Sequence, residues 1–370
     1  MALAEHMKAA VLTGHGGFDQ LVVRNDFPVP KPDRNEVLIE VGACGINNTD
    51  INTRIGWYSK SVSSGTTSNG GAGGIEAVTE ADATWGGRTV VFPRIQGADV
   101  AGRIVVVGNG VPPGRVGERV IVDPWIRDRT NPQDRNLAGF FGSERDGGFA
   151  QYTAVPAENA FAVKSSLSDA ELASFPCSYS TAEHMLDRID LQEGETILIP
   201  GASGGVGSAL VQLAQRRKAG VLGITSKSKM DFIRQLGACD VFERHQIDLE
   251  PKIREASPGK EVDAVADIVG GADFVMYLDL LARGGRYVTA GAIAGPMVEL
   301  DLRTLYLKDL TLYGATVMPV GIFKRLVGYI EKAEIRPLVA KQYPIDRIKE
   351  AQAAFLDKQH VGNFIVLPWK

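Results

Sequence analysis

The sequence is poor in the features that crosslink a chain or anchor it in a membrane. Its 370 residues include three cysteines, Cys44, Cys177 and Cys239, too scattered for a disulfide framework and without a C-x-x-C pair. These counts exclude a disulfide scaffold and a structural zinc lobe. No apolar run approaches a membrane span, and the N-terminus lacks the regions of a secretory signal peptide. We therefore expect a cytoplasmic protein with no membrane partner.

The chain also lacks a strong charge of either sign. The formal net charge is −4 and no long basic run is present, so nothing indicates a nucleic-acid partner. Hydrophobic residues make up 44% of the chain and charged residues 23%, which is typical of an ordinary globular protein. A chain of 370 residues is too long for one comfortable hydrophobic core, so its length predicts two domains.

A glycine-rich turn in the middle of the chain separates an apolar run at 195–200 from a helical pattern. Gly204 allows the backbone to approach a pyrophosphate, and Gly207 lets the helix lie against its strand. The unpaired N–H groups of the helix N-terminus would face the anion. Such turns can be purely structural, but this context favours a dinucleotide site. Its predicted residues are Ala202, Ser203, Gly204, Gly205, Val206 and Gly207.

The residues after the next predicted strand, 220–225, select the cofactor. An NAD site needs a carboxylate there to bind the ribose 2′-hydroxyl. The strand is followed instead by Ser226, Lys227 and Lys229, ahead of a predicted helix at 230–236. Cations at the positive end of a helix are unfavourable unless an anion lies nearby, and a 2′-phosphate would be that anion. We therefore predict NADP(H). The alternative is that both lysines are solvated surface charge.

The pattern of predicted elements changes near residue 160. Before it, short alternating runs between turn signals predict a β-rich domain. After it, a capping box at 168–171 and further helical stretches, one of them opened by Thr181, alternate with apolar runs. This alternation predicts an α/β fold with a doubly wound parallel sheet. We expect a β-rich domain at 1–160 and 335–370, closed by a C-terminal strand, and a dinucleotide domain at 161–334.

Two long polar stretches interrupt the β-rich part, at 59–92 and at 123–146. Residues 59–74 are almost wholly Ser, Thr, Gly and Asn, which predicts a mobile surface loop that is either disordered or a lid. Just before them, Asn48 or Thr49 can cap a short helix that Gly56 ends. We expect the two stretches to shape the substrate pocket, although neither carries a motif that names a substrate.

Four short motifs stand out, at 97–102 (Gly-x-Asp-x-Ala-Gly), 117–120 (Gly-Glu-Arg-Val), 202–207 (Ala-Ser-Gly-Gly-Val-Gly) and 236–238 (Leu-Gly-Ala). With the order of the predicted domains, they resemble the medium-chain dehydrogenase/reductase superfamily over essentially the whole chain. The resemblance implies a GroES-like β-rich catalytic domain and a Rossmann domain. It also implies that five further residues line the nucleotide or the nicotinamide: Thr181, Val269, Gly270, Gly291 and Ala292.

Zinc alcohol dehydrogenases of this superfamily hold their catalytic metal with two cysteines and a histidine. The corresponding positions here are Asn47, Ala98 and Cys177. A lone thiol cannot complete a tetrahedral shell, so we expect no zinc. The alternative is an atypical metal site that recruits Asp99 or Cys44. Asparagine in place of the first cysteine resembles zinc-independent quinone oxidoreductases and enone reductases, which also share the R-x-G-x-Y spacing found at 54–58.

Without a metal, the charge that develops on a substrate oxygen during hydride transfer needs donors already in place. We predict this role for the Asn47 amide and the Tyr58 hydroxyl, with Thr49 and Asp50 in support. Tyr58 can equally be an aromatic plug beside Trp57, and Asp50 a helix N-terminal charge.

The predicted function is an NADPH-dependent, metal-free reductase of a quinone or an α,β-unsaturated carbonyl. One alternative is an alcohol or aldehyde dehydrogenase with an atypical zinc site. Another is an NADPH-binding sensor whose catalysis has lapsed.

The apolar run at 310–317 is expected to come last in the parallel sheet. An exposed strand edge offers unpaired backbone groups to a neighbour. Related proteins pair edge to edge at this strand, so the resemblance implies a homodimer formed through 310–317.

Overall fold

The computed structural model describes residues 3–76 and 78–370, and the chain divides into two compact units. The β-rich unit comprises the residues up to Val62, together with Thr67–Cys177 and Pro319–Lys370; the α/β unit comprises Ser63–Thr66 and Ser178–Met318. The expected boundaries near 160 and 335 therefore move to 177 and 319. The reason is packing, because the Phe161 ring lies 5.1 Å from that of Phe323 and ties both flanking segments to the β-rich unit.

The β-rich unit is built around β3 (Glu36–Ile46), which pairs antiparallel with β5, β9 and β18. Its seven-stranded sheet has the order β10-β6-β5-β3-β18-β17, with β9 on β3; β2-β1-β4 form a second sheet and β7-β8 a third. The other strands are β1 (His6–Leu12), β2 (Leu21–Pro28), β4 (Arg94–Ile95), β5 (Asp99–Val107), β6 (Arg119–Val122), β7 (Trp125–Ile126), β8 (Gly139–Phe140), β9 (Tyr152–Pro156), β10 (Ala160–Ala162), β17 (Val339–Pro344) and β18 (Asn363–Leu367).

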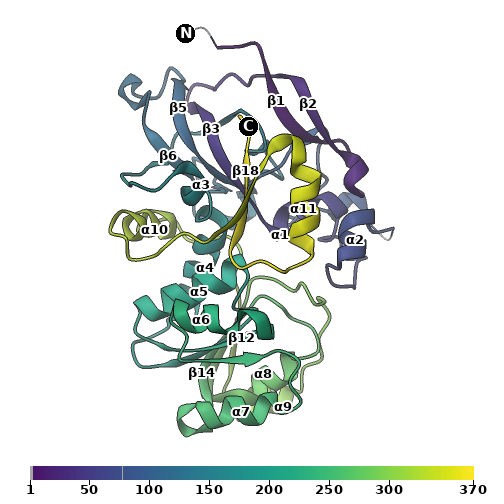
Figure 1. Ribbon diagram of the computed structural model, residues 1–370, viewed down its shortest axis with the longest axis vertical. Coiled ribbons are helices and arrows are strands. Elements are labelled where there is room, and N and C mark those ends of the chain that lie inside the picture. The colour runs from purple at the N-terminus through teal and green to yellow at the C-terminus, as the bar shows by residue number, and fades with distance from the viewer. Residues whose placement is uncertain (1–2, 77) are drawn as a thin grey trace. The chain divides into compact units, whose positions relative to one another are not determined.

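The C-terminal segment returns to this sheet. Phe364 of β18 pairs with Ile46 of β3, and α11 lies beside β18 (Figure 1). The predicted closing strand is therefore confirmed. The helices of the unit are α1 (Asn48–Ile55), α2 (Ser68–Gly73), α3 (Asp169–Leu172), α10 (Ile322–Glu331) and α11 (Ile348–Leu356).

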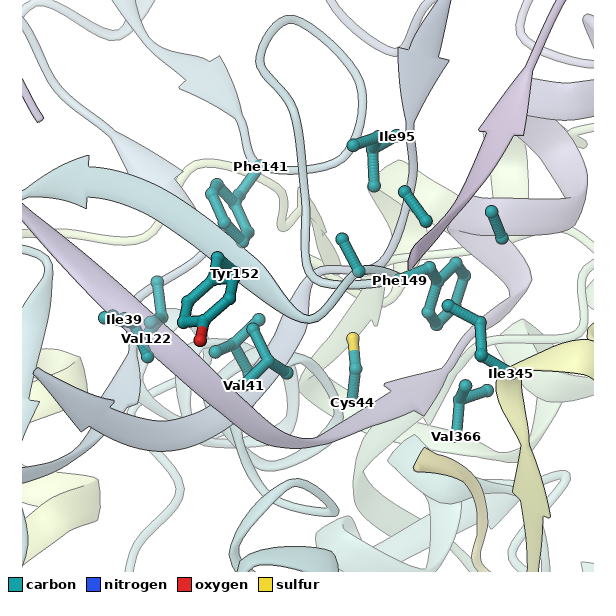
Figure 2. Close-up of a cluster of buried hydrophobic side chains, with 14 of the residues drawn as sticks. Ile39, Val41, Cys44, Ile95, Val122, Phe141, Phe149, Tyr152, Ile345 and Val366 are labelled. Carbon is teal, nitrogen blue, oxygen red and sulfur yellow. The ribbon is translucent and has the colours of Figure 1, made fainter. Parts of the chain in front are cut away.

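The core of the β-rich unit is aliphatic and aromatic. Figure 2 shows the Cys44 sulfur on β3 among Val41, Phe149, Tyr152 and other apolar side chains. Cys44 is fully buried, and burial raises the pKa of its thiol well above the ordinary value. This cysteine is therefore an inert core residue.

The α/β unit contains a six-stranded parallel sheet in the order β13-β12-β11-β14-β15-β16. Helices α5 and α6 cover one face, and α7, α8 and α9 the other (Figure 1), which confirms the doubly wound sheet. Its strands are β11 (Thr196–Pro200), β12 (Gly220–Thr225), β13 (Asp240–Glu243), β14 (Val262–Asp267), β15 (Leu281–Thr289) and β16 (Thr311–Gly314). Its helices are α4 (Pro176–Arg188), which begins in the last residues of the β-rich unit, α5 (Gly205–Arg216), α6 (Met230–Leu236), α7 (Leu249–Ala256), α8 (Phe274–Leu280) and α9 (Leu302–Leu307).

Two predictions about local structure were wrong. Helix α4 (Pro176–Arg188) begins five residues before Thr181, because the carboxylate of Asp99, far away in the sequence, accepts the N–H of Cys177 in its first turn. The stretch expected to be a loop contains α2, because the buried Gly71 packs on Leu356 and its carbonyl accepts a hydrogen bond from Arg54 at 2.6 Å.

The second polar stretch also contains regular structure. Within 123–146, β7 and β8 pair antiparallel, with Trp125 opposite Phe140. Aromatic contacts between these strands explain why the segment folds back on itself. The mostly polar composition of the segment gave no sign of these contacts. Across the described residues, no helix combines the length and apolarity needed to cross a membrane.

Candidate active site

The first part of the site is the N-terminus of α1. Asn47 has extended backbone angles, φ −128° and ψ 166°, and is the N-cap, so the caps predicted at Asn48 or Thr49 lie too late. The carboxylate of Asp50 reaches back and accepts the backbone N–H of Asn47 at 2.8 Å. Gly56 ends the helix as predicted, with φ 69°.

The amide of Asn47 is held by a second carboxylate. Its Nδ2 donates to Asp99 Oδ2 at 2.8 Å, and the other oxygen of Asp99 accepts the backbone N–H of Cys177 at 2.5 Å. Asn47 is 7% exposed and Asp99 fully buried. Gly45 makes room for this pair, because a Cβ there would lie 2.7 Å from Asp99 Oδ2. Asp99 thus fixes the orientation of the Asn47 amide.

Asp50 and Asp99 are two buried carboxyl groups in one small region. Gly97 N donates to Asp50 Oδ1 at 3.1 Å, and Gln96 Nε2 donates to the Asp50 carbonyl at 2.8 Å. The pKa of each carboxyl is raised to about 7, mainly by burial, and the charge of Asp99 contributes to the rise at Asp50. Each group can therefore hold a proton near neutral pH.

Tyr58 and Thr49 complete the predicted catalytic set. Burial raises the pKa of the Tyr58 hydroxyl; Cys177, Asp50 and Glu144 add to the effect and a hydrogen bond with Asn52 opposes it. Tyr58 therefore remains protonated, and a donor, at neutral pH. Among the residues that the structure describes, Thr49 Oγ1 is buried without a hydrogen-bond partner. All four predicted residues lie on α1 or on the segments that flank it.

The residues at the family's zinc positions do not fit a zinc ion. Ala98 offers no donor, the Asn47 amide is hydrogen bonded to Asp99, and only the Cys177 thiol is a usual zinc ligand. Within residues 3–76 and 78–370, no cluster of three or more His, Cys, Asp or Glu side chains could hold a metal.

The glycine-rich turn lies where the sequence placed it, between β11 and α5. Gly204 is the N-cap of α5, and the half-buried Gly205 and Val206 form its first turn. A Cβ at Gly207 would collide with the Gly201 carbonyl, so this glycine is required for the helix to approach the loop. Ala202 and Ser203 are buried beneath the turn, and Ser203 Oγ accepts a hydrogen bond from Thr225 at 2.8 Å.

The other predicted cofactor residues follow the carboxyl ends of neighbouring strands. Because the sheet is parallel, the loops after β11, β12, β14 and β15 meet at one edge. Asp267, at the end of β14, accepts the backbone N–H groups of Val269 at 2.7 Å and Gly270 at 3.2 Å. Gly291 and Ala292 follow β15 and are half-buried, as is Thr181 within α4.

Three cations gather after β12 and β13. Ser226 and Lys227 are partly or fully exposed, whereas Lys229 is only 8% exposed. Burial, and then the charge of Arg244, lower the pKa of the Lys229 ammonium. Arg244 N donates to the carbonyl of Thr225 at 2.9 Å, which places Arg244 beside the lysine loop. Sequence reasoning missed Arg244; the signal available was a basic residue directly after the strand that neighbours β12.

Two family models match the chain. Residues 33–165 match the alcohol dehydrogenase GroES-like domain, and residues 205–332 match the zinc-binding dehydrogenase domain. The rat (Rattus norvegicus) quinone oxidoreductase is 26% identical, with 98% of each chain covered. An NAD-dependent alcohol dehydrogenase of Sulfurisphaera tokodaii is 25% identical over 93% of this chain and 95% of that protein.

Among solved structures, a "putative alcohol dehydrogenase" from Sinorhizobium meliloti 1021 is 46% identical, with a TM-score of 0.87, and the match covers 99% of this chain and 98% of that one. This chain belongs to the medium-chain dehydrogenase/reductase superfamily. It is therefore an oxidoreductase with a GroES-like domain and a Rossmann domain, in a family whose members bind nicotinamide cofactors.

The stability of the protein should fall as pH rises through neutrality. Asp50 and Asp99 have folded-state pKa values of about 7, above the ordinary 3.8. The folded state therefore binds protons more tightly than the unfolded state. This contribution is full below about pH 4 and is lost as pH rises through about 7.

Urea denaturation of the wild type and Asp99→Asn at pH 5, 6, 7 and 8 measures this slope. We expect Asp99→Asn to flatten it while lowering stability at pH 5, because Asn47 and Cys177 donate to different oxygens of Asp99 and the new amide nitrogen would face one of these donors. The exposed Asp26→Asn is the control and should keep the wild-type slope. A wild-type profile that is flat or rising from pH 5 to 8 would contradict the prediction.

Proposed function

We propose that this oxidoreductase is an NADPH-dependent, metal-free reductase that transfers hydride to a quinone or an α,β-unsaturated carbonyl. The observation that carries the proposal is the Asn47–Asp99 hydrogen bond, which engages the side chain that stands at the sequence position of a zinc-binding cysteine in the zinc relatives. The likeness to quinone oxidoreductases over nearly the whole chain supports the same reaction class. In a quinone or an enone, the negative charge that develops during hydride transfer is delocalised. Hydrogen bonds from the protein can stabilise such a charge without a metal ion.

In this mechanism the nicotinamide, when bound, supplies the hydride, and the β-rich unit supplies hydrogen bonds to the substrate oxygen. Thr49 Oγ1 is buried and, within the described chain, lacks a partner, so its hydroxyl can donate to an oxyanion without breaking another bond. The Asn47 amide is held in one orientation by Asp99, and preorganised donors lose little freedom during the reaction. Tyr58, kept protonated by burial, is a further donor.

The choice of NADPH rests on the three cations after β12 and β13. Burial, and then the charge of Arg244, lower the pKa of the Lys229 ammonium. A dianionic 2′-phosphate would neutralise both charges and accept hydrogen bonds from Lys229 and Arg244. The glycine turn and the helix N-terminus of α5 would hold the pyrophosphate.

The family also suggests an alcohol or aldehyde dehydrogenase with an atypical zinc site, and a cofactor-binding sensor without turnover. A panel of substrates separates these functions. Quinones, enones and aldehydes are tested for oxidation of NADPH, and alcohols for reduction of NADP⁺, by the absorbance of NADPH. Oxidation of NADPH by quinones or enones in metal-free enzyme supports the proposal. Two outcomes would overturn it. One is turnover of alcohols or aldehydes alone by enzyme that holds stoichiometric zinc, and the other is tight NADPH binding without any turnover.

Replacing the cations after β12 and β13 should weaken the binding of NADPH but not that of NADH. We expect Lys229→Ala and Arg244→Ala each to weaken NADPH binding by about 10- to 100-fold while sparing NADH, because a charge-assisted hydrogen bond is worth roughly 1.5–3 kcal/mol. Lys227→Ala should have a smaller effect because its side chain is exposed. Fluorescence titration gives both dissociation constants. Lys252→Ala, on the surface of α7, is the control, and equal losses for both cofactors would remove the phosphate argument.

Truncating the asparagine amide should affect turnover more than cofactor affinity. We expect Asn47→Ala to lower kcat by about 100-fold, as removal of one preorganised donor typically does, with little change in the dissociation constant for NADPH. Stopped-flow single-turnover measurements isolate the hydride step. Asn48→Ala, the next residue, whose side chain bonds to Lys358, is the matched control. An unchanged kcat would return Asn47 to a capping role.

We also propose that the chain forms a homodimer through β16, the last strand of the sheet. Sheet order leaves its outer edge unpaired within the described chain. Large apolar side chains are exposed on the segment that precedes it, which suits burial against a second copy. They are Met297, Val298, Leu300, Leu302, Tyr306 and Leu307, from 38% to 75% exposed.

A charged substitution on this apolar segment should therefore produce monomers. Leu307 is 56% exposed, so Leu307→Asp should leave the fold intact while placing a buried charge in the interface. Light scattering coupled to size exclusion measures the mass. The control is Ile247→Asp, which changes the fully exposed residue after β13, at the opposite edge of the sheet. A wild-type monomer, or a Leu307→Asp dimer, would contradict the interface.

A further inference from the structure

Asp267, the last residue of β14, is a buried carboxyl group that the proposed hydride transfer does not use. It is fully buried, and its hydrogen bonds come from neutral donors. Oδ1 accepts the backbone N–H of Val269 at 2.7 Å and that of Gly270 at 3.2 Å, whereas Oδ2 accepts the hydroxyl of Tyr287 at 2.6 Å. The carboxyl group therefore joins the loop after β14 to the neighbouring strand, β15.

Tyr287 is itself fixed by packing. Its side chain is 3% exposed, and its ring lies 5.2 Å from the ring of Phe274 on α8, in edge-to-face contact. Burial, and then the charge of Asp267, raise the pKa of the Tyr287 hydroxyl, so this group stays protonated and donates at neutral pH. A donor on an immobile ring gives the Asp267 carboxyl group a defined position.

The loop after β14 needs such a hold. It contains two consecutive glycines with positive φ, Gly270 at 64° and Gly271 at 76°. Glycine adopts this conformation without strain, but it loses more conformational freedom on folding than any other residue. Because Asp267 accepts the N–H groups of Val269 and Gly270, it fixes the backbone exactly where the glycines begin.

Val269 connects this loop to two other loops that are predicted to bind the cofactor. The backbone N–H of Ala294, after β15, donates to the Val269 carbonyl at 2.8 Å, and an isolated β-bridge joins the same two loops again. Towards the glycine turn after β11, a Cβ at Gly201 would lie 2.9 Å from the Val269 side chain. A shift of Val269 would therefore disturb the loops after β11, β14 and β15 together.

We propose that Asp267 and Tyr287 are positioning residues for the nicotinamide cofactor. The hydroxyl fixes the carboxyl group, and the carboxyl group fixes the backbone of the loop after β14. Both side chains are buried, so they act through this backbone and do not touch the cofactor. The proposal rests on the cofactor binding of the proposed function. It concerns the part of the site that NADPH and NADH share, unlike the cations after β12 and β13.

The test compares two substitutions of the same carboxyl group. We expect Asp267→Ala to raise the dissociation constants of NADPH and NADH alike, by about 10-fold, because two buried N–H groups lose their acceptor. Asp267→Asn should stay close to the wild-type values. Its amide oxygen can accept from the loop, and the Tyr287 hydroxyl can turn to accept from the amide nitrogen. Fluorescence titration measures both constants.

Tyr287→Phe removes only the hydroxyl and keeps the ring against Phe274. We expect it to weaken the binding of both cofactors, and it provides the test if Asp267→Ala does not fold. The matched control is Asp263→Ala, near the start of the same strand. Asp263 also accepts a backbone N–H, that of Thr196 at 2.7 Å, but it lies at the end of β14 away from the cofactor loops. Its removal should leave both dissociation constants unchanged.

Amide hydrogen exchange in cofactor-free enzyme gives a second measurement, independent of binding. Peptides that cover 268–271 should exchange faster in Asp267→Ala than in the wild type, because local opening becomes easier when the backbone loses its acceptor. Asp267→Asn should restore slow exchange. Peptides from β11 and α5 show whether the rest of the unit stays folded.

The outcomes separate this role from the reductase function. Wild-type affinities in Asp267→Ala and Tyr287→Phe, equal losses in Asp267→Ala and Asp267→Asn, or the same loss in Asp263→Ala would overturn the positioning role. Each of these results leaves the reductase function standing. Weaker binding of both cofactors in Asp267→Ala, in an enzyme whose wild type oxidises NADPH with no quinone or enone, would support the positioning role and overturn the reductase function.

Discussion

The carboxylate of Asp99 is the interaction on which the candidate site depends. From a fully buried position at the start of β5, it accepts the side-chain N–H of Asn47 and the backbone N–H of Cys177. These bonds orient the N-cap of α1 and stabilise the start of α4. A buried hydrogen-bond acceptor thus stands beside the positions where zinc relatives place ligands. Hydrogen bonding can replace the organising role of a metal when its donors and acceptors are buried and paired.

The cofactor region follows a different physical rule, that of the parallel sheet. Backbone groups after β11 and β14 are held by local bonds, such as those from Val269 and Gly270 to Asp267. Cations after β12 and β13 add positive charge beside this edge of the sheet. The first feature is common to dinucleotide folds, whereas the second distinguishes one nucleotide from another, which is why Lys229 and Arg244 carry the argument for NADPH.

Predictions succeeded where the determining contacts are local. The helix at 230–236 has the predicted bounds, and the capping box of Ser168 and Glu171 forms reciprocal bonds. The glycine turn, the parallel sheet and the returning C-terminal strand were also recovered, because their signals are spacing and periodicity. The superfamily that the four motifs indicated is confirmed. Predictions failed at the start of α4 and at α2, where contacts with distant residues decide the conformation. The cap of α1 was also wrong, although the capping box of Asn47 and Asp50 is a local signal.

By itself, the sequence determined the fold class, the position of the nucleotide turn and the identity of Asn47 at the family's metal position, since each follows from residue type and short-range spacing. Only the tertiary structure decided that Asp99 holds that asparagine, that Arg244 joins Lys229, and that Asp267 joins Tyr287 to the loop after β14. Each of these depends on residues brought together across strands and loops. Burial then changes hydrogen bonding and pKa in ways that no linear pattern records.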